Sequence, residues 1–270
     1  MMWIVLIVIV SFLLLYLLLI QCRGNHPGIA SLRGWAYAHR GLHGNGVPEN
    51  SMQAFRLAKD SGYGIELDIH LMADGELAVI HDASLKRTAG VDVFIEDLTQ
   101  AQLKDYSLEG TEETIPTFQQ VLALYDGAAP LIIELKAERN NAARLCDAAC
   151  KALDGYKGAF CIESFDPRCI AWLKKNRPDL IRGQLARNFL AYSDGQLPWI
   201  LKLALSCHLT NIVTKPDFIA YRFQDRKRLG NFLCRNLWGA QGVTWTIKTE
   251  ADYAAAVAEG WLPIFESFRP

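Results

Sequence analysis

Short apolar runs alternate with amphipathic stretches after residue 34, and no other feature limits the fold as strongly. The strand candidates are 35–38, 64–69, 77–80, 131–135, 159–163, 181–184, 211–213, 243–247 and 262–265, and the helix candidates include 49–61, 117–125, 140–153, 167–176, 221–237 and 250–259. Strands that alternate with helices predict an α/β fold with a parallel sheet. The length suits a (β/α)8 barrel, which takes about 250 residues. Because no helix fits between 69 and 77, we expect one strand to be a hairpin extension or to lie outside the barrel.

The N-terminus carries an apolar run from Trp3 to Ile20 that is interrupted only by Ser11. At about 1.5 Å per residue the run is roughly 27 Å long, just enough to cross a bilayer core. No Lys or Arg precedes it and no small-residue cleavage site follows it, so we expect a retained single-pass transmembrane helix rather than a cleaved signal peptide. The expected organisation is an anchor at 1–22, a linker at 23–34 and a barrel domain at 35–270.

Charge and cysteine usage bear on location and partners. The 28 basic and 29 acidic residues balance, so nothing suggests binding to nucleic acid. Arg23, Arg33 and Arg40 follow the apolar run, and positive charge tends to stay on the cytoplasmic side, which predicts a cytoplasmic body. Seven cysteines without a C-x-x-C pair agree with reduced thiols. The oligomeric state is left open.

Polar residues gather where the first four strand candidates end. In chain order they are His39 and Arg40, Glu66 and Asp68, His81 and Asp82, and Glu134 and Lys136. In a parallel barrel the carboxyl ends of the strands form one rim, from which catalytic residues are drawn. Glu66 and Asp68 are two apart on a strand and therefore face the same side.

Three carboxylates that converge at one rim repel one another unless a cation lies between them. Oxygen ligands favour Mg²⁺ or Ca²⁺ over Zn²⁺. The sequence thus predicts a divalent-cation site at Glu66, Asp68 and Glu134. The alternative is a buried salt-bridge cluster with Lys136 and Arg40, but two histidines and an Arg-Gly turn at the same rim favour the metal site.

These motifs resemble the glycerophosphodiester phosphodiesterase family. The matching runs are His39-Arg40-Gly41, Pro48-Glu49-Asn50-Ser51, Gly64-Ile65-Glu66-Leu67-Asp68, Asp74-Gly75, His81-Asp82, Glu134-Leu135-Lys136, Ser164-Phe165 and Trp245-Thr246. The resemblance implies a TIM barrel that uses a divalent cation to hydrolyse small-molecule glycerophosphodiesters to an alcohol and sn-glycerol 3-phosphate.

The resemblance also implies roles for individual residues. His39 and His81 match the family's acid/base pair, and Glu66, Asp68 and Glu134 match its metal ligands. Arg40 and Lys136 match positive charges beside the phosphate. Trp245, which precedes the last residues of a strand candidate, is expected to line the substrate pocket.

Other features leave alternatives open. The C-terminal run 263–268 departs from the family pattern, and 184–232 is hard to align, which leaves the leaving-group specificity undefined. A phospholipase D-like lipid phosphodiesterase on the same barrel, or a catalytically inactive membrane-tethered binding protein, are the alternative functions. We expect His43 to face solvent, and the apolar stretch 197–205 around Trp199 to pack as core rather than to face a membrane.

Overall fold

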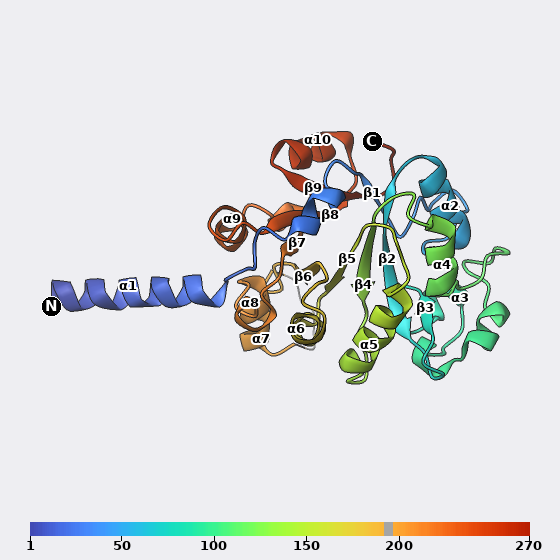
Figure 1. Ribbon diagram of the computed structural model, residues 1–270, viewed down its shortest axis with the longest axis horizontal. Helices are drawn as coiled ribbons and strands as arrows, with labels where there is room; N and C mark the ends of the chain where they lie inside the picture. Colours follow the sequence, from blue (N-terminus) through green and yellow to red (C-terminus); the bar gives the residue numbers. More distant parts are fainter. Residues whose placement is uncertain (192–196) are drawn as a thin grey trace.

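Eight apolar runs of the sequence form parallel strands that close into a barrel (Figure 1). The computed structural model describes residues 1–191 and 197–270. The barrel strands are β1 (Tyr37–His39), β2 (Gly64–Leu71), β4 (Leu131–Leu135), β5 (Phe160–Ser164), β6 (Arg182–Ala186), β7 (Phe218–Arg222), β8 (Gln241–Ile247) and β9 (Trp261–Phe265). β1 pairs with both β2 and β9, which closes the ring. The predicted (β/α)8 TIM barrel is confirmed.

The surplus strand candidate is β3 (Leu77–Val79), which pairs antiparallel with β2 outside the barrel. This confirms the expected hairpin. The chain from β3 to residue 115 then forms α3 (Lys86–Ala89), η2 (Ile95–Asp97) and η3 (Gln100–Asp105) around a separate apolar cluster that includes Ile80, Leu85 and Leu103.

Helices cover the outside of the barrel, and several begin at the caps that the sequence supplies. They are α2 (Met52–Asp60), α4 (Phe118–Tyr125), α5 (Ala142–Leu153), α6 (Pro167–Asn176), α7 (Trp199–Ser206), α8 (Asn211–Thr214), α9 (Leu229–Asn236) and α10 (Glu250–Ala258), with the short η4 (Phe223–Asp225) after β7. Ser51 accepts a hydrogen bond from the Ala54 amide at the start of α2, and Thr117 and Gln120 form a capping box on α4.

One strand candidate is wrong. Residues 211–213 form the start of α8 instead of a strand. The barrel strand at this point is β7, whose last two residues fall within the stretch 221–237 that the sequence predicts as a helix. Lys215 has φ of +42° and ends α8 just before Pro216, which separates the helix from the strand. An apolar run this short does not distinguish a helix from a strand by its periodicity.

The register brings the polar residues to one level of the barrel. His39 lies beside Glu66, Asp68 beside Glu134, and Glu134 beside Glu163 on β5. Below this level the interior is filled by apolar side chains such as Tyr37, Ile132 and Phe218. η1 (Pro27–Leu32), within the segment expected as a linker, adds its buried Ile29 and Leu32 to the same cluster.

The N-terminal helix α1 (Met2–Leu19) extends away from the barrel (Figure 1). Its 18 residues have a mean hydropathy of 3.0 and none is buried, so it is long and apolar enough to cross a membrane. Just beyond it, Ile20 and Cys22 are buried and Arg23 is paired with Asp217.

The prediction that the stretch 197–205 packs as core is wrong, because Trp199 and Ile200 on α7 are exposed.

Candidate active site

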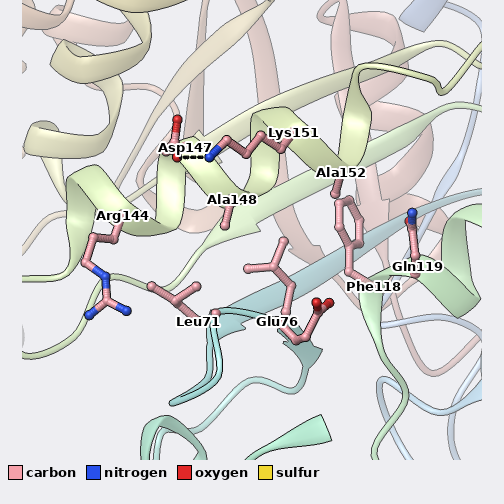
Figure 2. A pocket seen from close by; sticks show the side chains of 11 residues that line it. Leu71, Glu76, Phe118, Gln119, Arg144, Asp147, Ala148, Lys151 and Ala152 are labelled. Carbon is pink, nitrogen blue, oxygen red and sulfur yellow. Dashed lines mark ion pairs between the residues drawn. The ribbon is translucent and has the colours of Figure 1, made fainter.

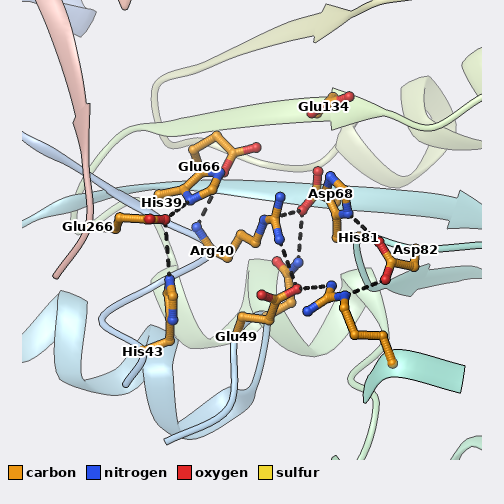
Figure 3. Close-up of polar contacts among 12 residues, drawn as sticks. His39, Arg40, His43, Glu49, Glu66, Asp68, His81, Asp82, Glu134 and Glu266 are labelled. Carbon is orange, nitrogen blue, oxygen red and sulfur yellow. Dashed lines mark hydrogen bonds and ion pairs between the residues drawn. The ribbon is translucent and has the colours of Figure 1, made fainter. Parts of the chain in front are cut away.

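Three buried carboxylates meet at the carboxyl-terminal rim of the barrel. One oxygen from each of Glu66, Asp68 and Glu134 can be chosen so that all lie within 4.8 Å of one another. Glu66 and Asp68 come from β2 and Glu134 from β4, which is hydrogen-bonded to β2 (Figure 3). The structure therefore brings together the three residues that the sequence singles out as metal ligands.

The buried carboxylates of this cluster repel one another, which shifts their pKa values. Burial raises the pKa of Glu66 well above its usual value, and the neighbouring charges of Asp68 and Glu134 raise it further. Burial raises the pKa of Glu134 to about 7, with Lys136 opposing the shift. Burial also acts to raise the pKa of Asp68, but the positive charges of Lys136, His81 and Arg40 outweigh it and hold that pKa well below its usual value.

Two cations partly offset these charges. The Lys136 Nζ lies 2.7 Å from Glu134 Oε1 and 3.1 Å from Asp68 Oδ1, and the Arg40 Nε lies 3.4 Å from Asp68 Oδ2. These ion pairs form the buried salt-bridge cluster that is the alternative to a metal site. Neither cation lies within ion-pair distance of Glu66 in the described residues; the neighbour there is the His39 Nε2, 3.9 Å from Glu66 Oε2.

A fourth carboxylate makes the negative excess larger. Glu163 on β5 is 1% exposed, and neither of its side-chain oxygens has a hydrogen-bond partner among the described residues. Burial raises its pKa, as do the charges of Glu134 and Asp68. Four carboxyl groups face two cations, and a hard divalent cation among the oxygens would remove the repulsion. The residues present therefore fit such an ion. Sequence reasoning missed Glu163, although it precedes Ser164-Phe165 on a strand.

His39 is oriented by a carboxylate from the far end of the chain. Its Nδ1 lies 2.6 Å from Glu266 Oε2, next to the end of β9 (Figure 3). Burial lowers the pKa of His39, and the hydrogen bond to Glu266 opposes that shift. The hydrogen bond leaves Nε2 facing the carboxylates. His43 also approaches Glu266, with Nε2 3.8 Å from Oε2, so the expectation that His43 faces solvent is wrong.

His81 has a similar arrangement. Its Nδ1 lies 2.6 Å from Asp82 Oδ1, and Asp82 in turn accepts a hydrogen bond from Arg87. Burial lowers the pKa of His81, with Asp68 acting in the opposite direction. The buried His70 donates from Nε2 to the His81 carbonyl oxygen at 3.2 Å, and its Nδ1 lies 2.7 Å from Glu96 Oε1, so it supports the loop rather than the cluster.

A tight turn after β1 positions Arg40. Arg40 has φ of +53° and Gly41 of +80°, and a Cβ on Gly41 would lie 2.8 Å from the Ala54 backbone, so only glycine fits there. The Arg40 Nη1 lies 2.9 Å from Glu49 Oε1. The Asn50 Nδ2 donates to Asp68 Oδ2 at 2.9 Å, which braces that carboxylate.

An aromatic row borders one side of the rim. Trp245 on β8 contacts Phe165 edge to face, with ring centroids 5.6 Å apart, and Phe165 contacts Phe189 in the same way at 6.0 Å. Trp245 is partly exposed, and its indole N–H has no hydrogen-bond partner in the described residues.

A separate hollow of about 470 Å³ lies between α5, α4 and the β2–β3 hairpin (Figure 2). Leu71, Phe118 and Ala148 line it together with Arg144 and Glu76. Neither the carboxylate cluster nor the two histidines border it.

A match to a family model shows which protein family the chain belongs to. The model of the glycerophosphoryl diester phosphodiesterase family matches residues 39–229, well over half of the chain. The chain belongs to the glycerophosphoryl diester phosphodiesterase family. The match includes His39, Glu66, His81 and Glu134, whereas Glu266 lies beyond it.

Curated members of the family match parts of the chain. A glycerophosphodiester phosphodiesterase from Caldanaerobacter subterraneus subsp. tengcongensis is 34% identical over 182 residues, which is 63% of this chain and 72% of that protein. One from Bacillus altitudinis is 42% identical over 111 residues, 38% of this chain and 45% of that protein. A lysophospholipase D from Rattus norvegicus is 34% identical over 116 residues, 38% of this chain and 36% of that protein. The last two alignments span less than half of the relative's length.

Solved structures of family members share the fold. An Oleispira antarctica phosphodiesterase in complex with the product sn-glycerol-3-phosphate has a TM-score of 0.70 and 23% identity, covering 86% of this chain and 92% of that chain. A Thermotoga maritima glycerophosphodiester phosphodiesterase has a TM-score of 0.65 and 22% identity, covering 86% and 93%.

Proposed function

We propose that this chain hydrolyses glycerophosphodiesters to an alcohol and sn-glycerol 3-phosphate. The observation that carries the proposal is the meeting of three buried carboxylates and two carboxylate-oriented histidines at one rim of a family barrel. Family membership supports the reaction class, as do the names of the relatives.

Glu66, Asp68 and Glu134 would hold a divalent cation, Mg²⁺ or Ca²⁺. The cation would polarise the phosphoryl oxygens and offset the charge that builds up on them. Arg40 and Lys136 lie beside the same carboxylates and would attract the phosphodiester anion. Adding Mg²⁺ or Ca²⁺ back to chelator-treated enzyme, and comparing the turnover each restores, identifies the ion.

His39 and His81 would move the protons. One imidazole takes the proton from the attacking oxygen, and the other gives a proton to the alkoxide that leaves as the phosphorus–oxygen bond breaks. Burial lowers the pKa of both histidines, which favours the neutral ring that the general base needs, whereas the general acid has to carry the proton that it donates. Glu266 and Asp82 hold the two rings in one orientation through Nδ1.

The two roles separate experimentally. His39→Ala and His81→Ala should each lower the rate on glycerophosphocholine by about 10²-fold or more. A nitrophenyl leaving group needs little protonation, so it should partly rescue the general-acid variant and not the general-base variant. Full activity of both folded variants would remove the histidines from the mechanism.

A lipid substrate is the second candidate. The aromatic row of Trp245, Phe165 and Phe189 provides an apolar side wall beside the rim, with Trp245 as the proposed substrate contact. The lysophospholipase D relative points to the same class. Turnover of lysophosphatidylcholine, compared with glycerophosphocholine and with the Trp245→Ala variant, distinguishes the two. No turnover of either by metal-loaded protein would favour an inactive binding protein.

The proposal includes a membrane location. α1 would cross the bilayer once as part of an anchor at 1–22. The barrel domain at 35–270 would lie on the cytoplasmic side, joined to the anchor through 23–34, which packs against the barrel. The hydropathy of α1 and the arginines that follow it support this arrangement. Resistance of the protein to alkaline extraction, and protection of the body from protease in intact cells, test the anchor and the side.

A further inference from the structure

Helices α7, α8 and α9 expose large apolar side chains to solvent. Trp199 on α7 is 68% exposed, and Leu229 and Phe232 on α9 are 65% and 60% exposed. The same set, called the apolar end here, includes Ile200, Ile212 and Val213. Exposed apolar residues gathered on neighbouring elements mark an interaction surface more often than scattered ones do.

The apolar end surrounds the base of α1. In Figure 1, α7, α8 and α9 lie at the side of the barrel from which α1 leaves. The Asn211 Nδ2 of α8 donates to the Ile20 carbonyl at 3.2 Å, and the Cys234 Sγ of α9 contacts the same oxygen at 3.5 Å. Tyr16 and Leu17 already pack against the core of the domain. The end of α1 is therefore fixed between α8 and α9.

This attachment leaves α1 too short to cross a bilayer by itself. From Met2 to Leu15 the helix is free of the domain, which is about 21 Å at 1.5 Å per residue. A bilayer core is about 30 Å thick. The shortfall of about 9 Å is close to the depth of roughly 5–10 Å at which apolar faces lie in the lipid interface.

The charge around the apolar end matches a lipid surface. Residues 199–215 and 226–238 contain no Asp or Glu, whereas they include Lys202, Lys215 and Arg228. Lys227 and Arg235 in the same segments contact Glu259 instead. Basic residues beside an apolar face favour contact with anionic headgroups.

We propose that the apolar end of the barrel is immersed in the interface of the same bilayer that α1 crosses. The inference rests on the proposed membrane location of α1 and is independent of the catalytic activity. The domain is then held side-on at the lipid surface by two contacts, the spanning helix and the face formed by α7, α8 and α9.

Fluorescence quenching by lipids brominated in the acyl chain measures this contact in the full chain. Trp3 is replaced by Phe to silence the indole in α1, and the protein is reconstituted in vesicles of phosphatidylcholine and phosphatidylglycerol. We expect quenching that is lost when Trp199→Phe is added. The matched control Trp172→Phe, which removes a half-buried indole on α6, should retain it.

A second variant tests the rest of the face while Trp199 stays as the reporter. Leu229→Gln with Phe232→Gln should lift the domain and reduce the Trp199 quenching. Val257→Gln, an exposed apolar site on α10, should leave it unchanged.

Two results would overturn the proposal. If Trp3 of the unmodified chain is quenched and Trp199 is not, the barrel stands clear of the lipid and the bilayer thins around α1 instead; cross-linked dimers in that case would make a second copy the occupant of the face. If neither indole is quenched, α1 does not enter the bilayer. Release of sn-glycerol 3-phosphate in detergent, measured on the same protein, reports on catalysis separately.

Discussion

Glu266→Gln tests whether the hydrogen bond between His39 and Glu266, at the end of the last barrel strand, matters for catalysis. The hydrogen bond between Glu266 Oε2 and His39 Nδ1 is 2.6 Å long, and both side chains are largely buried. Hydrogen bonds to charged groups contribute about 1.5–3 kcal/mol. Because about 1.36 kcal/mol corresponds to a tenfold change in rate, we expect kcat/KM to fall by about 10- to 100-fold.

The Glu266→Gln variant should also shift the pH dependence of kcat/KM in a defined direction. Glu266 raises the pKa of His39 against the lowering effect of burial, so removing its charge lowers that pKa further. The limb of the kcat/KM profile that belongs to His39 should therefore move to lower pH, whichever proton His39 transfers.

The assay is release of sn-glycerol 3-phosphate from glycerophosphocholine across pH. Lys248→Gln is the matched control, because Lys248 contacts the other oxygen of Glu266 at 2.6 Å and is largely exposed; it should change the rate only slightly. An unchanged rate and an unchanged profile in folded Glu266→Gln would refute the positioning role.

Four further predictions concern the metal and the N-terminus. Alanine at Glu66, Asp68 or Glu134 should abolish metal-dependent turnover, and normal activity at limiting metal would remove that residue from the site. Calorimetry should show divalent-cation affinity falling as pH drops through about 7, where Glu134 becomes protonated; affinity independent of pH would contradict this. Deleting residues 1–15 should give a soluble, active enzyme. Deleting 1–24 should cost about 3–5 kcal/mol in unfolding experiments, because it removes the partner of buried Asp217; equal stability of the two forms would contradict the packing described for this segment.

The sequence predicts those parts of the site that lie within single strands. Glu66 and Asp68 are two residues apart, and the polar residues follow apolar runs, so local spacing is enough to bring them to one rim. Glu266 is 227 positions from His39, and only the pairing of Ala38 with Phe265 makes them neighbours. A barrel closes by pairing its first and last strands, which are far apart in the chain, and this pairing leaves no pattern in the local sequence.

The wrong predictions about the fold also arise because local sequence does not show long-range packing. A run such as 211–213 is too short to show a period, and its apolar Ile212 and Val213 turn outward on α8. Hydropathy alone does not distinguish an apolar side chain that packs in the core from one that is exposed, and the exposed Trp199 is an example. The position of α1 supplies the missing information, since it shows which side of the barrel lies nearest to the proposed membrane.

The central claim is that this rim hydrolyses glycerophosphodiesters with the help of a bound divalent cation. The most direct measurement is the release of sn-glycerol 3-phosphate from glycerophosphocholine by the full chain, before and after chelation and after a divalent cation is added back. We predict release that chelation stops and the cation restores, with no release by Glu66→Ala under any of these conditions. Equal release with and without chelator, or no release by cation-loaded protein, would contradict the claim.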